Sequence, residues 1–126
     1  WVLLAGMTIT QVGIWELKDA VDRPRPPEPL TSSSGSSFPS DHAAHSGIYL
    51  WLAVTIVLRL RPGMARATEV VVTCIALTAL VGLSRVYLNV HYLSDVNAGW
   101  ALGAAAFSLC ALVGLVVSQV RQNPEQ

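Results

Sequence analysis

The sequence predicts an all-α integral membrane protein built as a bundle of four spanning helices. Hydrophobic residues make up 52% of its 126 residues and charged residues only 13%, about half the charged share of a soluble domain. The apolar residues form four long stretches, and three polar connections separate them. A chain of this length and composition is expected to form one membrane-embedded domain, residues 1–126.

The first stretch, Trp1 to Leu17, is apolar with scattered threonine and glutamine and is long enough for most of a spanning helix. The sequence opens on Trp1 inside an apolar run, so we expect the N-terminal part of the domain to be missing. Residues 18–41 are charged and then rich in proline, serine and glycine, which predicts an extended extramembrane loop. Ser40 and Asp41 are good N-cap types for a second helix that reaches Leu60.

A short basic connection, Arg59 to Arg66, leads into the third apolar stretch, Val70 to Leu83. The fourth, Val96 to Val120, is dense in glycine and alanine, which allow membrane helices to approach closely. Between these last two stretches lies a polar island, residues 84–95.

The arginines of the middle connection mark it as cytoplasmic by the positive-inside rule. The 18–41 loop and the 84–95 island then share the outer face, as in a protein of the bacterial plasma membrane. Lys18, Arg23 and Arg25 in the outer loop count against this orientation. Positive and negative residues are equal in number, so the overall charge does not point to nucleic acid.

Helix connectivity alone brings several chemically capable residues to one side of the membrane. Three cations there, Lys18, Arg25 and Arg85, suit a doubly charged phosphate, whose oxygens an arginine can bind in a bidentate fork. His91 can act as a nucleophile, base or ligand, and Asp95, four residues later, is placed to accept its Nδ1–H. The start of the second helix adds free backbone N–H groups and the positive end of a helix dipole. The candidate site residues are Lys18, Arg25, Ser40, Asp41, His42, Arg85, His91 and Asp95.

Simpler interpretations exist for individual members. A single lysine or arginine at a membrane edge also fits a snorkelling anchor. Ser40 and Asp41 fit an ordinary helix cap, and Asp95 fits the cap of the fourth helix.

Three motifs carry a family resemblance. Lys18 is followed after six residues by Arg25-Pro26; Pro39-Ser40-Asp41-His42 comes next; Ser84-Arg85 is followed after five residues by His91 and after three more by Asp95. In this order they resemble the signature of the type 2 phosphatidic acid phosphatase family, membrane lipid phosphatases related to vanadium haloperoxidases. The resemblance covers residues 18–95.

The resemblance implies a hydrolase that needs neither metal nor cofactor and works through a phosphohistidine. By it, His91 attacks phosphorus and Asp95 orients it, while His42 protonates the leaving oxygen and then activates water. The phosphoryl oxygens are cradled by Lys18, Arg25, Ser40 and Arg85, with the backbone N–H groups of Asp41 and His42. The implied partner is a lipid phosphate or diphosphate substrate in the membrane.

Two features depart from the family pattern. Asp41 stands where glycine is more usual, which is similar to the branch of undecaprenyl diphosphate phosphatases and favours a polyprenyl diphosphate over phosphatidic acid or phosphatidylglycerol phosphate. The family core commonly has six spanning helices, whereas four are expected here. His45 lies outside the signature and is interpreted as a helix residue near the interface.

Two other functions stay open from the residues alone. The two histidines of the second helix, with His91 and Asp95, also suit a metal ion in a membrane transporter. A non-catalytic helical scaffold is the third hypothesis. Neither the lipid used nor the oligomeric state follows from the sequence.

Overall fold

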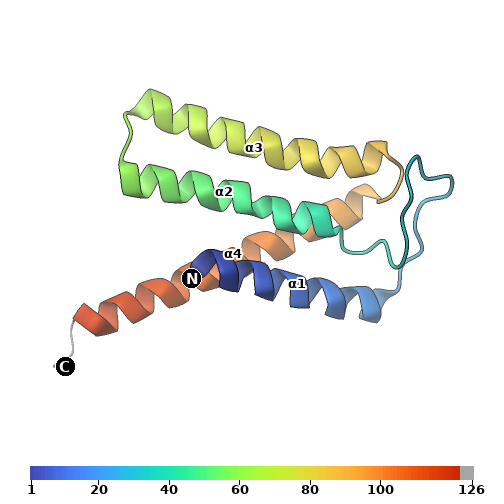
Figure 1. Cartoon of the computed structure of the whole chain (residues 1–126), viewed down its shortest axis with the longest axis horizontal. Helices are drawn as coiled ribbons and strands as arrows, with labels where there is room; N and C mark the ends of the chain where they lie inside the picture. Colours follow the sequence, from blue (N-terminus) through green and yellow to red (C-terminus); the bar gives the residue numbers. More distant parts are fainter. Residues whose placement is uncertain (123–126) are drawn as a thin grey trace.

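The structure, a computed structural model, describes residues 1–122, which form four helices and no strand (Figure 1). The helices are α1 (Val2–Val21), α2 (Asp41–Leu60), α3 (Met64–Tyr87) and α4 (Leu93–Gln122). The protein is thus an all-α bundle, as the sequence predicts.

Three of these helices, α2, α3 and α4, are long and apolar enough to cross a membrane. The prediction of four spanning helices is therefore one too high on length and composition. The difference comes from α1, whose second half carries the charged residues Glu16, Lys18 and Asp19.

The helices α2 and α4 form the centre of the bundle, because each of them contacts all three other helices. The glycines of α4 permit a close approach to α2. A Cβ added to Gly99 would lie 2.5 Å from the Ser40 carbonyl oxygen, and one added to Gly103 would collide with the Ala44 carbonyl. The expectation that small residues in the last helix bring helices together is met at this crossing.

The other helices are placed by similar contacts. On α1, Gly6 leaves room for the Phe107 ring of α4. The helix α3 packs mainly on α2, where the Thr78 hydroxyl donates a hydrogen bond of 3.2 Å to the Ser46 carbonyl. Between α2, α3 and α4 an apolar groove of about 850 Å³ is lined by Trp51, Trp100 and other apolar side chains.

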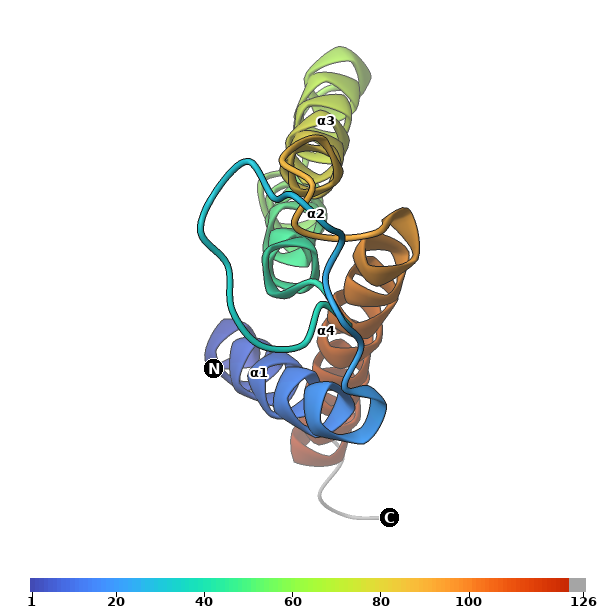
Figure 2. The same cartoon turned by 90° about the vertical axis from the view of Figure 1, so that its right-hand side faces the viewer.

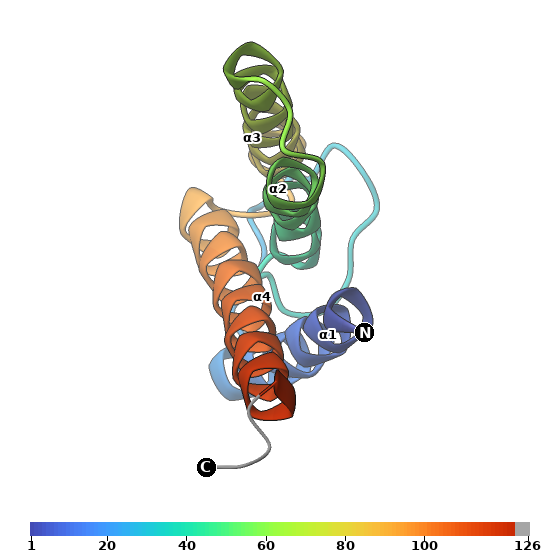
Figure 3. The ribbon, with the colours of Figure 1, turned by 90° about the vertical axis from the view of Figure 1, so that its left-hand side faces the viewer.

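The two longer connections lie at one end of the bundle. Residues 22–40 arch over the start of α2, and residues 88–92 turn into α4 beside them (Figure 2). The short connection 61–63 lies at the opposite end (Figure 3). This arrangement follows from the alternating directions of α2, α3 and α4.

The helices are longer than the apolar stretches that predict them. The helix α1 continues to Val21, so Lys18 lies in its last turn and not in the loop. The helix α3 extends to Tyr87 and α4 starts at Leu93, which reduces the expected polar island to five residues. Polar residues continue these helices because their backbone N–H and C=O groups are best satisfied within the helix.

Candidate active site

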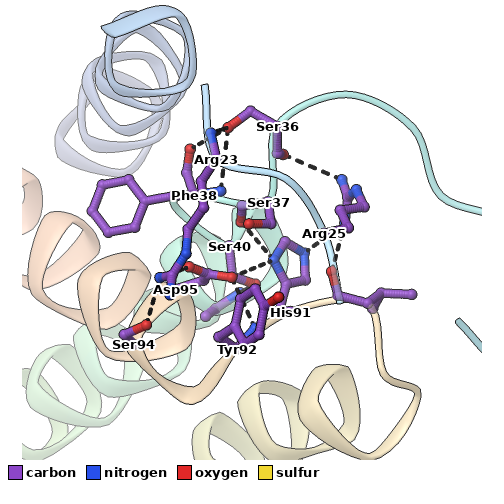
Figure 4. Close-up of polar contacts among 12 residues, drawn as sticks. Arg23, Arg25, Ser36, Ser37, Phe38, Ser40, His91, Tyr92, Ser94 and Asp95 are labelled. Atoms are coloured by element: carbon purple, nitrogen blue, oxygen red, sulfur yellow. Dashed lines mark hydrogen bonds and ion pairs between the residues drawn. The ribbon is translucent and has the colours of Figure 1, made fainter. Parts of the chain in front are cut away.

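Three segments that are far apart in the sequence meet at this end of the bundle (Figure 4). The two ends of the loop that joins α1 to α2 are tied together by a hydrogen bond of 2.8 Å from the Ser37 N–H to the Arg23 carbonyl. The start of α2 is tied to the start of α4 by the Ser40 N–H, which donates to the Asp95 carbonyl at 3.0 Å. These backbone bonds fix the positions from which the polar side chains project.

His91 lies in the turn before α4, and its side chain is almost fully buried. Its Nδ1 is 2.7 Å from the carbonyl oxygen of Ser37. A carbonyl can only accept, so Nδ1 carries the proton and Nε2 keeps its lone pair. Nε2 is 3.4 Å from Nη1 of Arg25. The ring is therefore fixed with its basic nitrogen toward a cation.

The sequence predicts that Asp95 accepts the Nδ1–H of His91, and this prediction is wrong. The Oδ2 of Asp95 is 3.8 Å from that nitrogen and instead accepts the Tyr92 N–H at 2.8 Å. His91 precedes α4, so the four-residue spacing is not one helical turn here. Asp95 is the third residue of the helix, where a carboxylate reaches back to the N-cap N–H. It is fully buried.

Arg25 is anchored by loop carbonyls. Nη1 donates to the Val90 carbonyl at 2.9 Å, Nη2 to the Ser34 carbonyl at 2.9 Å, and Nε to the Gly35 carbonyl at 3.1 Å. With these bonds the guanidinium plane is held beside the His91 ring. A fixed guanidinium is the group best suited to grip phosphate oxygens in a fork.

Lys18 and Asp41 form an ion pair at the edge of the site. Nζ lies 3.0 Å from Oδ1 of Asp41, at an angle outside hydrogen-bond geometry, and donates to the Ser36 carbonyl at 2.8 Å. Lys18 therefore partly neutralises the carboxylate of Asp41, the residue that stands in the second motif where glycine is more usual.

The start of α2 is capped by Ser40, whose buried Oγ accepts the Ala43 N–H at 3.4 Å. His42 follows on the first turn and is exposed. The His45 ring is turned back onto its own helix, with Nδ1 2.9 Å from the Asp41 carbonyl. Within residues 1–122, no group of three or more His, Cys, Asp or Glu side chains is placed to hold one metal ion.

Arg85 is at the end of α3 and is half-buried. In the described part of the chain its side chain makes one hydrogen bond, from Nε to the Ser84 Oγ at 3.2 Å. Its charge acts on the His42 ring, and that of Arg25 acts on both His42 and His91. The two imidazoles thus share one cationic environment.

The electrostatics of His91 follow from burial and from these cations. Burial lowers the pKa of the imidazole below its ordinary value of 6.5, and the charges of Arg25 and Lys18 lower it further. The hydrogen bond to Ser37 and the charge of Asp95 oppose this shift without cancelling it. The ring is therefore neutral at neutral pH, which is the form that can attack phosphorus.

Two parts of the site are not predicted from the sequence. The Ser37 carbonyl holds the His91 ring, and Arg23 pairs with Asp95 at 2.8 Å. The serine lies in a low-complexity run that gives no signal for one member. Arg23 does carry one, because it repeats the Arg-Pro pattern of Arg25-Pro26 two residues earlier.

Comparison with known proteins identifies the family of this chain. The family model described as PAP2 superfamily matches residues 1–118. The chain belongs to the PAP2 superfamily. This confirms the resemblance seen in the three motifs, because PAP2 denotes the type 2 phosphatidic acid phosphatases.

Among characterised PAP2 proteins, phosphatidylglycerophosphatase B of Bacillus subtilis is 38% identical over 110 residues, which are 85% of this chain and 54% of the relative. The crystal structure of the transmembrane PAP2-type phosphatidylglycerolphosphate phosphatase of Bacillus subtilis superposes with a TM-score of 0.82 at 31% identity, over 91% of this chain and 58% of that one. The chain thus spans a little over half the length of these relatives.

The crystal structure of LpxE from Aquifex aeolicus superposes with a TM-score of 0.69 at 22% identity, over 87% of this chain and 65% of that one. At this identity the likeness concerns the fold alone. The helical fold is thus common to this chain and both solved structures.

Proposed function

We propose that this PAP2 protein hydrolyses a phosphate ester of a membrane lipid through a phosphohistidine on His91. One observation supports this most: the ring has its Nδ1 proton bound by a carbonyl and its Nε2 lone pair directed at a cation. A neutral imidazole with one free nitrogen beside an anion-binding group is an activated nucleophile.

In the first step Nε2 of His91 attacks phosphorus, and the bond from phosphorus to the lipid oxygen breaks. His42, in its protonated form, gives its proton to that leaving oxygen. As the new N–P bond forms, the ring takes on positive charge, and the carboxylate of Asp95 at 3.8 Å stabilises it.

In the second step His42, now neutral, takes a proton from a water molecule. The water oxygen attacks phosphorus, the N–P bond breaks, and inorganic phosphate leaves with His91 neutral again. The exposure of His42 at the start of α2 gives water access to its ring.

The cations do most of the electrostatic work, since phosphoryl transfer depends on positioning and charge stabilisation. Arg25 and Arg85 bind the phosphoryl oxygens, with Lys18 at the edge. The N–H groups at the start of α2 point to the same end of the bundle.

The proposed substrate is phosphatidylglycerol phosphate, because the names of the Bacillus subtilis relatives specify that lipid. Phosphatidic acid and a polyprenyl diphosphate are the alternatives, the latter suggested by Asp41. The apolar groove between α2, α3 and α4 offers room for hydrocarbon chains. We place the site on the outer face of a bacterial plasma membrane.

A phosphate-release assay on the purified protein in lipid vesicles tests this function. We expect release from phosphatidylglycerol phosphate above that from the other two lipids, and none from the His91→Ala variant. Turnover by His91→Ala equal to that of the wild type would contradict the nucleophile. Activity in excess EDTA is expected to persist, whereas its loss would favour the metal-binding alternative.

A further inference from the structure

Arg23, in the loop after α1, reaches the start of α4. Its Nη1 donates to Oδ1 of Asp95 at 2.8 Å and to Oγ of Ser94 at 2.7 Å (Figure 4). About a third of the arginine side chain is exposed, while Asp95 is fully buried. A buried carboxylate needs a counter-charge, and in the described part of the chain Arg23 is the one permanently charged side chain paired with it.

The contact also uses the shape of the guanidinium. Its Cζ lies over the Tyr92 ring, 4.4 Å from the ring centroid, while Nη1 donates to Ser94 and Asp95. An ammonium can keep the ion pair but lacks the planar group that covers the ring and donates at the same time.

The backbone of Arg23 belongs to the same network. Its N–H donates to Oγ of Ser36 at 3.1 Å, and its carbonyl accepts the Ser37 N–H at 2.8 Å. The Ser37 carbonyl in turn holds Nδ1 of His91. One residue therefore contacts both groups that face the protonated side of the His91 ring.

We propose that Arg23 is a positioning residue for the phosphatase reaction, which fixes the Asp95 carboxylate and the Ser37 carbonyl around the nucleophile. This inference rests on the proposed function of His91. Arg23 takes one oxygen of Asp95 and the Tyr92 N–H takes the other, so the carboxylate stays 3.8 Å from Nδ1. From this distance the Asp95 carboxylate stabilises positive charge on the His91 ring without taking the Nδ1 proton.

Arg23 also limits how strongly Asp95 attracts a proton to the ring before the reaction. The other charged groups acting on His91 are Arg25 and Lys18. When the Arg23 charge is removed, the field of Asp95 on the ring is no longer compensated, and proton binding by His91 becomes more favourable. The acid limb of the pH profile should then move to higher pH, an effect that a purely structural role would not produce.

The test compares Arg23→Gln and Arg23→Lys with the wild type in the phosphate-release assay on vesicles. Arg66→Gln, which removes an exposed arginine at the opposite end of the bundle, is the matched control. We expect Arg23→Gln to lower kcat roughly 10- to 100-fold, as misplacement of reacting groups does, with KM changed less than about twofold. The lysine variant should be intermediate, and the control should match the wild type.

The acid limb of kcat/KM is the second measurement. It should lie at higher pH in Arg23→Gln than in the wild type, and this difference should disappear between Asp95→Asn and the Arg23→Gln, Asp95→Asn double variant. Wild-type kcat in Arg23→Gln, a change confined to KM, or an unmoved limb would overturn the inference. So would a loss of activity that only follows the folded fraction measured by size-exclusion chromatography.

Failure of the proposed function gives a different result. A wild-type protein without phosphate release, or one with full activity in His91→Ala, refutes the function itself. An active wild type that depends on His91 but not on Arg23 refutes only the positioning role.

Discussion

His91 is held by a backbone carbonyl and not by the carboxylate that the spacing suggested. The Ser37 carbonyl fixes the tautomer, while Asp95 supplies charge from 3.8 Å and caps α4. This division of roles leaves the carboxylate free to pair with Arg23. The nucleophile can thus be oriented and electrostatically supported by different groups.

The pH dependence of activity follows from the environment of His91. Burial lowers the pKa of the ring, aided by the charges of Arg25 and Lys18. Because the neutral ring is the nucleophile, we expect the acid limb of kcat/KM to lie below the ordinary value of 6.5. A limb at or above that value, measured with phosphate release between pH 4 and 8, would contradict the assigned role.

The same shift has a consequence for stability. The unfolded chain binds a proton on this histidine near pH 6.5, whereas the folded chain binds it at lower pH. The contribution of His91 to folding is therefore fully present above pH 6.5 and is lost as the pH falls below it.

Arg85 is expected to act on the substrate, since its Nη atoms have no hydrogen-bond partner in the described part of the chain. Arg85→Ala should lower kcat/KM about 100-fold or more, as loss of a charge-stabilising donor does. Vanadate, which adopts the five-coordinate geometry of the reaction centre, should compete with substrate in the wild type and bind more weakly to the variant. Non-competitive inhibition, or equal inhibition of both proteins, would argue against a phosphate pocket at Arg85.

At the scale of the elements, the crossing of α2 and α4 positions the site. The same contact that brings the helices together places the Ser40 N–H on the Asp95 carbonyl. Two glycines at this crossing differ in what a methyl group would meet. A Cβ on Gly103 collides with the Ala44 carbonyl, whereas one on Gly47 lies at ordinary van der Waals distances of 3.6 to 3.9 Å.

The same substitution at these two glycines should therefore have opposite effects. Gly103→Ala should destabilise the protein by about 1–3 kcal/mol through overpacking. Gly47→Ala should be neutral or stabilising by up to about 1 kcal/mol, because alanine favours the helix. Thermal unfolding in detergent measures both; equal shifts in Tm would show that the crossing is looser than the structure has it.

At the scale of the whole molecule, periodicity and composition predict the helical bundle and the end at which the polar residues gather. Apolar runs are visible in sequence because they must face lipid or other helices. The helix ends were less predictable, since polar residues such as Lys18 and Arg85 continue α1 and α3. The count of spanning helices failed for the same reason, because α1 is helical without being sufficiently apolar.

The contacts within the site were not predictable, because they join residues that are far apart in the sequence. The bond from His91 to the Ser37 carbonyl spans 54 residues, and the pair of Arg23 and Asp95 spans 72. Motif spacing identifies residues of the right chemistry. Which oxygen each nitrogen meets depends on how the two loops cross at the end of the bundle.

The orientation of the molecule in the membrane is a prediction that labelling can test. Single cysteines at Ser33 and Met64, exposed residues at opposite ends of the bundle, would be introduced after Cys74 and Cys110 are replaced by alanine. If the basic connection between α2 and α3 is cytoplasmic, a membrane-impermeant maleimide should label the Ser33→Cys variant in intact bacterial cells and the Met64→Cys variant only after permeabilisation. The reverse pattern would place the site at the inner face, which is the side that Lys18, Arg23 and Arg25 favour by the same rule.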